Sequence, residues 1–112
     1  MKIGTTMLLL CIPLLSQAAD DVTARRNFGT ELAGCSAYYG ARAGAPGISK
    51  QDHDDLGTKS HTALKAAASV TNNQFALTKE AEAQAKPEAI NGALCDQVMA
   101  HPNERFAYWR GR

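Results

Sequence analysis

Hydrophobic residues recur at helical spacing near the start of the chain. Four of them follow one another at intervals of four, three and four residues: Phe28, Leu32, Cys35 and Tyr39. This spacing places them on one stripe of an α-helix. Asp20 supplies the negative charge that a helix N-terminus favours, and the Gly-Ala-Pro-Gly sequence at 44–47 is a turn signal. The pattern predicts a helix from residue 20 to about residue 43.

Two glycines lie inside this predicted helix. Gly29 and Gly34 would each cost about 1 kcal/mol relative to alanine in a helix interior. One interpretation is that the missing side chains let another helix approach closely beside Cys35. The other is a locally weaker helix that a disulfide compensates, and the sequence leaves both open.

Two further helical segments follow. Ser49 is a typical N-cap residue, and apolar residues recur at near-helical spacing from Leu56 to Val70. The pattern predicts one helix over about 49–70 and another over about 74–85. Residues 71–73 (Thr-Asn-Asn) favour a turn or a cap between them, although one kinked helix is the alternative.

The last third of the chain predicts two short helices. Pro87 fits the first turn of a helix, where its missing N–H is no loss. Ile90, Leu94 and Val98 lie four residues apart along that helix. A second proline interrupts it, and residues 102–109 then predict one more short helix.

The whole pattern indicates an all-α fold. No segment alternates apolar and polar residues as a half-buried strand does, and β-branched residues and proline are sparse. We expect either a small helical bundle or paired helical hairpins, closed by one disulfide.

The first 18 residues are typical of a secretory signal peptide. Lys2 supplies a positive charge, residues 7–15 form an apolar run, and residues 16–18 (Ser-Gln-Ala) place small side chains at a cleavage site. The run is shorter than the about 20 residues that span a bilayer. Lipidation at Cys11 is an alternative, although the residue before it is not small.

Cleavage after Ala18 would leave a short chain of balanced charge. Lys2 is one of twelve Lys and Arg residues, so eleven would remain against eleven Asp and Glu residues. This balance gives no reason to expect nucleic acid or an acidic membrane as partner. We expect residues 19–112 to form a single all-α domain with no stable membrane insertion.

Cys35 and Cys95 are the two cysteines of the expected mature chain. Because an exported chain meets an oxidising compartment, we expect them to form a disulfide. Closing a loop of about 60 residues would stabilise the fold by about 4 kcal/mol. This is comparable with the net stability of a small domain. The expected localisation is periplasmic or secreted.

Residue types that carry catalytic or metal chemistry are few. Asp54 and His61 lie seven residues apart, so they share a helix face and are the metal candidates. Zinc needs three or four ligands, and an acidic helix start is the alternative interpretation of Asp54. The sequence has no phosphate-binding loop, HExxH helix or Cys-X-X-Cys pair. We expect no enzymatic activity and no cofactor.

Aromatic and basic residues gather at two places. Tyr38 lies off the core stripe, whereas Arg105, Tyr108 and Trp109 crowd the C-terminus. Tyr, Trp and Arg are enriched at interface hot spots, so these four residues form a candidate partner-binding patch. The alternative is that Phe106 and Trp109 cover the open end of a small core.

Two segments of the chain carry a resemblance to known proteins. The segments Glu31–Tyr39 and Cys95–Trp109 resemble those of small exported proteobacterial proteins of unknown function. Those proteins pair a Cys-x-x-Tyr-Tyr helix with a distal cysteine and a final Tyr-Trp. The resemblance implies a periplasmic helical protein and carries no activity with it. The layout is also similar to that of acid-stress periplasmic chaperones, although the cysteine spacing differs and their lysine-rich C-terminal helix is missing.

These observations predict a protein-binding or accessory factor that contacts another envelope or periplasmic protein. An inhibitor, an immunity or exclusion factor, and a subunit of an envelope assembly all fit. A stress chaperone is the first alternative, because protonation of eleven carboxylates would leave a positive chain whose self-repulsion loosens the bundle. A metalloprotein that uses Asp54 and His61 is the alternative of another class.

Overall fold

The computed structural model describes residues 20–112. The predicted signal peptide, residues 1–18, with its cleavage site after Ala18 and the alternative lipidation site at Cys11, lies outside the described residues. Residue 19 is therefore the one residue of the expected domain (residues 19–112) that lies outside the described residues.

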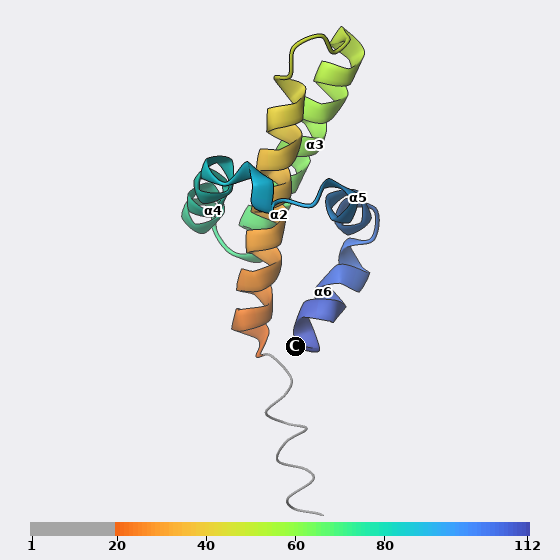
Figure 1. Ribbon diagram of the computed structural model, residues 1–112. Helices are drawn as coiled ribbons and strands as arrows, with labels where there is room; N and C mark the ends of the chain where they lie inside the picture. Colours follow the sequence, from red (N-terminus) through yellow and green to blue (C-terminus); the bar gives the residue numbers. More distant parts are fainter. Residues whose placement is uncertain (1–19) are drawn as a thin grey trace, which may run out of the picture.

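The described chain is all-α, as predicted. Its elements in order are α2 (Asp21–Ala43), α3 (Lys50–Val70), α4 (Asn73–Ala85), the 3₁₀ helix η1 (Pro87–Ala89), α5 (Gly92–Ala100) and α6 (Pro102–Arg110). Helix α2 runs through the middle of the molecule, and α4 and α6 flank it on opposite sides (Figure 1). Within residues 20–112 no helix combines the length and the apolar character that crossing a membrane requires.

Side-chain caps set where α2, α3 and α4 begin. Asp20 accepts the N–H of Thr23 at 2.7 Å and begins α2, and Ser49 accepts the N–H of Asp52 at 3.0 Å and begins α3. Asn72 accepts the N–H of Phe75 at 2.8 Å. Because each cap satisfies a free donor of a helix N-terminus, it fixes the chain direction there. The cap at Asn72 makes α3 and α4 two separate helices.

The predicted start of the fourth helix at Pro87 is wrong. Pro87 begins the short 3₁₀ helix η1, and α5 begins at Gly92. Asn91 accepts the N–H of Leu94 at 3.2 Å, so this side chain and not the proline begins α5. Ile90 therefore lies on the connection that crosses α2 and not on a helical stripe (Figure 1).

The core consists of two clusters along α2. One cluster joins α2 to α3, α4 and α5 through residues that include Phe28, Leu32, Ala67 and Val98. The other surrounds Cys35 and Tyr39 and includes Leu56 and Ala63 of α3. All four residues of the predicted stripe on α2 are buried: Phe28, Leu32, Cys35 and Tyr39.

The predicted disulfide between Cys35 and Cys95 is present. The two Cα atoms lie 5.4 Å apart, and both residues are buried. The bridge fastens α5 to the middle of α2. A buried disulfide is typical of proteins outside the reducing cytoplasm.

A polar network joins the three helices α2, α3 and α4. Ser36 of α2 is 1% exposed, and its hydroxyl donates to Glu80 of α4 at 2.5 Å. Ser60 of α3 donates to the backbone carbonyl of Ser36 at 2.8 Å. These bonds satisfy a buried hydroxyl and fix how the helices are placed along one another.

The two glycines of α2 differ in their surroundings. A Cβ added at Gly29 would lie 2.5 Å from the Thr71 methyl group at the end of α3, whereas one added at Gly34 would meet nothing within 4 Å. The close-approach interpretation therefore holds for Gly29, and its contact is Thr71 and not the region of Cys35. It is wrong for Gly34.

Candidate functional site

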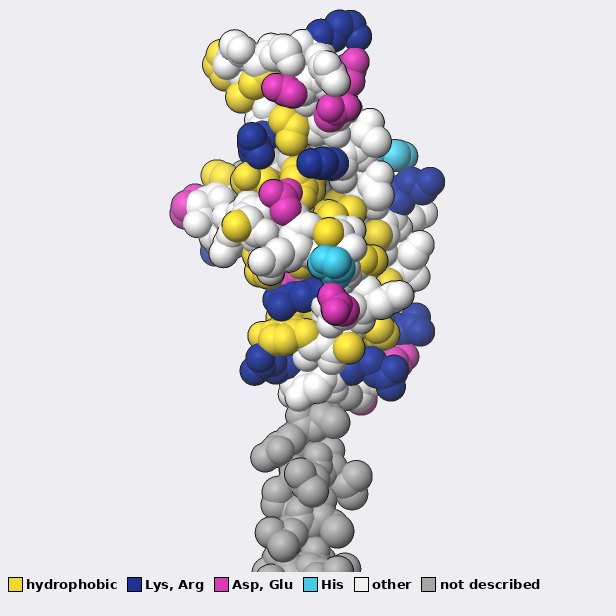
Figure 2. Space-filling view, turned by 90° about the vertical axis from the view of Figure 1, so that its right-hand side faces the viewer, with side chains coloured by type: hydrophobic (Ala, Val, Ile, Leu, Met, Phe, Trp, Pro, Cys, Tyr) yellow, Lys and Arg dark blue, Asp and Glu magenta, His cyan; other side chains and the backbone are white. Residues whose placement is uncertain are grey.

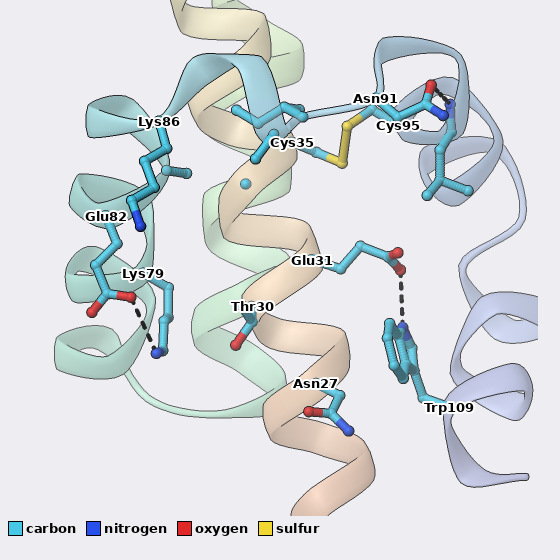
Figure 3. Close-up of a pocket in the computed structure, with 15 residues that line it drawn as sticks. Asn27, Thr30, Glu31, Cys35, Lys79, Glu82, Lys86, Asn91, Cys95 and Trp109 are labelled. Carbon is cyan, nitrogen blue, oxygen red and sulfur yellow. Dashed lines mark hydrogen bonds and ion pairs between the residues drawn. A yellow bond between two sulfur atoms is a disulfide. The ribbon is translucent and has the colours of Figure 1, made fainter. Parts of the chain in front are cut away.

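A groove of about 440 Å³ runs along α2 between α4 and α6. Figure 3 shows its parts: α2 forms the floor, α4 one wall, Trp109 of α6 the other wall, and the chain from Lys86 to Leu94 closes one end. Its volume falls within the range of about 300–1,000 Å³ that is usual for ligand sites.

The floor is one uncovered face of α2. Asn27, Thr30, Glu31 and Gly34 line the groove. Their intervals of three, one and three residues place them on one side of a helix. Helices α4 and α6 leave this side open because each packs on a different flank of α2 (Figure 1). Gly34 adds no side chain, and a Cβ built there would meet nothing within 4 Å.

The α4 wall carries charge. Lys79 of α4 and Lys86, the residue that directly follows α4, both line the groove. Glu82 lies between them and pairs with Lys79 at 3.2 Å. Among the ion pairs of residues 20–112, none involves Lys86.

The α6 wall is held by Glu31. Arg105 donates to both carboxylate oxygens of Glu31, at 2.7 and 2.6 Å, and the indole N–H of Trp109 donates to the same carboxylate at 3.0 Å. The side chains of Glu31 and Arg105 are only 12% and 20% exposed. Hydrogen bonding to Glu31 raises the pKa of Arg105 above its ordinary value, so the guanidinium keeps its charge. This pair secures α6 against α2.

The closed end of the groove is apolar. Ile90 and Leu94 are partly buried there, beside the disulfide and Ala89. Asn91 also lines this end, and its side-chain carbonyl is occupied as the cap of α5. The groove thus combines an apolar end with basic side chains along one wall.

The four residues of the predicted partner-binding patch do not meet at one surface. Arg105, Tyr108 and Trp109 lie together on α6, where the rings of Tyr108 and Trp109 are 5.2 Å apart. Tyr38 lies beyond the crossing connection and lines a different cavity. Its ring packs so closely on Gly92 that any added Cβ there would clash with it.

The three α6 residues also differ in exposure and in partners. Arg105 and Trp109 bind Glu31 within the molecule, whereas Tyr108 is 39% exposed. Basic and aromatic side chains lie close together on this side of the molecule (Figure 2), and the guanidinium groups of Arg105 and Arg112 lie 4.0 and 4.2 Å from the Tyr108 ring. Phe106 faces Phe28 at a ring distance of 5.6 Å. These internal contacts support the interpretation that α6 covers the end of the core.

The metal candidates lie on α3. Lys50 donates to Asp54 at 3.0 Å, and His61 lines a separate cavity between α3 and α4. Residues 20–112 contain no group of three or more His, Cys, Asp or Glu side chains that could hold a metal ion. Within this described range, Asp54 and His61 therefore have no third ligand beside them.

Sequence reasoning missed Glu31, Gly34 and Lys86 as groove residues. The sequence does contain a stripe of polar and small residues beside the core stripe of the same helix: Asn27, Thr30, Glu31 and Gly34. Such a stripe normally faces solvent. That it becomes a groove depends on where α4 and α6 pack.

Comparison of the chain with protein-family models, with curated proteins and with solved structures gave no match.

Proposed function

We propose that this protein is an exported protein-binding accessory factor that holds its partner in the groove on α2. The observation that carries the proposal is the uncovered α2 face between α4 and α6, which ends in an apolar, partly buried region. Grooves of this kind take apolar anchors from a partner and place charged residues at the rim. The disulfide supports action outside the cytoplasm, and the periplasm is the proposed compartment. An inhibitor, an immunity or exclusion factor and an envelope-assembly subunit all fit this role.

The test is site-specific photocrosslinking in periplasm. A photoreactive residue at Thr30 lies in the groove, and the same residue at Thr58 on α3 is a matched control. Both threonines are exposed, and each donates its hydroxyl to the carbonyl four residues earlier. We expect one protein to crosslink from Thr30 and not from Thr58.

The affinity of the purified partner then tests whether the groove is its contact surface. The partner should bind the wild-type domain and lose at least tenfold in affinity for Gly34→Phe, because the new ring fills the groove without meeting an internal atom at its Cβ. Equal affinity for the two proteins would remove the groove as the contact surface.

A stress chaperone is a second candidate, which one observation favours. Three carboxylates on three helices accept hydrogen bonds from another helix: Glu31, Glu80 and Asp96. A hydrogen bond to a carboxylate is weaker once that carboxylate is protonated, so strong acid would weaken contacts between helices. The chaperone role requires that a hydrophobic dye binds at pH 3 while the helices persist, and that the protein then keeps an acid-unfolded client soluble. Cooperative unfolding without client protection excludes it.

A further inference from the structure

We infer that the groove selects an acidic partner segment, whose apolar side chains enter the closed end while a carboxylate pairs with Lys86. This inference rests on the proposed function and names the chemistry of the partner. It follows from the placement of charge, space and apolar surface around the α2 floor.

Space and apolar surface determine what enters the closed end. The position above Gly34 is empty to 4 Å. Ile90, Leu94 and Ala83 line the same groove, and all three are partly buried. Each apolar group that leaves water here contributes about 25 cal/mol per Å². The closed end therefore favours a small or medium apolar side chain.

The charges of the groove walls determine which charged group of the partner can pair beside its apolar side chain. Glu31 is neutralised by Arg105 within the α6 wall, and Lys79 is neutralised by Glu82 within the α4 wall. Lys86 is left as the groove cation without an ion pair among the described residues, and it lies next to the apolar end (Figure 3). An incoming carboxylate gains a partner at Lys86, whereas an incoming ammonium group meets only carboxylates that are already paired. Charge complementarity of this kind provides specificity more than affinity.

Size limits how much of the partner enters. The groove lies near the lower end of the volumes usual for ligand sites. It therefore takes the side chains of a short segment and not a whole element. Anchors spaced along one side of such a segment would follow the direction of α2.

The test is selection from a displayed library of random peptides on the full domain with its disulfide intact. Four proteins are compared: wild type, Lys86→Glu, Gly34→Phe and Lys65→Glu. Lys65 is the matched control, because it is an exposed lysine that lines the cavity between α3 and α4 on another side of the molecule. Circular dichroism and thermal unfolding establish that all four are folded.

The inference requires that wild type and Lys65→Glu enrich peptides with Asp or Glu beside apolar residues. These peptides should bind Lys86→Glu at least tenfold more weakly and should not bind Gly34→Phe. Peptides that depend on Gly34 but are indifferent to Lys86 would overturn the acidic specificity and leave the proposed function in place. Absence of any Gly34-dependent peptide would overturn both. Peptides that match the chain's own sequence would show that a second copy occupies the groove, and would also overturn the inference.

Discussion

Glu31 is the acidic residue that secures α6 against α2. It receives three hydrogen bonds from Arg105 and Trp109 in a partly buried setting. Hydrogen bonds to a charged group contribute about 1.5–3 kcal/mol. We expect Glu31→Ala to lower the free energy of unfolding by about this amount, because Arg105 would remain without its counter-charge. Urea denaturation followed by circular dichroism measures the change.

The control for this prediction is Arg25→Ala. Arg25 pairs with Asp21 at 2.8 Å, but both side chains are about half exposed. An exposed pair four residues apart on a helix contributes only about 0.3–0.5 kcal/mol. If the two variants lost equal stability, burial would not be the reason that the Glu31 pair matters.

Because of Tyr39, we expect the folded protein to lose stability in alkaline solution. The side chain of Tyr39 is buried and donates to Asp96 at 2.7 Å. Burial and this hydrogen bond raise the pKa of Tyr39 well above its ordinary value of 10.0. The folded state therefore keeps the proton at a pH where the unfolded state releases it, so this stabilisation is complete below about pH 10 and declines above it.

The variant Tyr39→Phe isolates this contribution. Between pH 9 and pH 11.5, the free energy of unfolding of the wild type should fall more steeply than that of the variant, because the variant has no phenol to ionise on unfolding. Urea titrations at each pH provide the comparison. Parallel pH profiles for the two proteins would show that the folded state does not raise the pKa of Tyr39.

Helix α2 offers two glycines with opposite predicted responses to alanine. At Gly34 a methyl group meets nothing within 4 Å, so Gly34→Ala should stabilise the protein by about 0.5–1 kcal/mol through helix propensity. At Gly29 the methyl group would press on Thr71, whose hydroxyl is bonded to the Ala67 carbonyl. We therefore expect Gly29→Ala to destabilise by about 1–3 kcal/mol. Thermal unfolding of both variants tests the pair, and changes of the same sign would contradict it.

The helices could be predicted from the sequence because their signals are local. The cap at Ser49 and the stripe from Phe28 to Tyr39 each depend on residues that are close in the sequence, and both are found where expected. Pro87 misled the prediction because a proline suits the first turn of a 3₁₀ helix as well as that of an α-helix, and the cap at Asn91 decides where α5 begins. The site could not be predicted in this way. Glu31 and Arg105 are 74 residues apart, and no local pattern indicates which face of α2 the other helices leave open.

In the whole molecule, the C-terminal helices form a unit that depends on α2. Helices α5 and α6 pack mainly on α2 and on each other, whereas α3 and α4 also pack on each other. No residue of α6 is fully buried. The unit is held to α2 by the disulfide, by the bond between Tyr39 and Asp96, and by the Glu31 pair. Since Trp109 forms one wall of the groove, the groove exists only while this unit is in place.

This arrangement predicts how the protein responds to removal of the disulfide in the double variant Cys35→Ser, Cys95→Ser. In the chain-entropy model a bridge across 60 residues contributes about 4 kcal/mol. The loss should not be uniform, because local stability follows local packing. We expect hydrogen exchange to accelerate first in α5 and α6, while the amides of α2 and α3 around Ala33 and Ala67 remain protected. Exchange followed by mass spectrometry measures this for each helix. Equal acceleration in all helices would show one cooperative unit, in which the groove would be lost only when the whole domain unfolds.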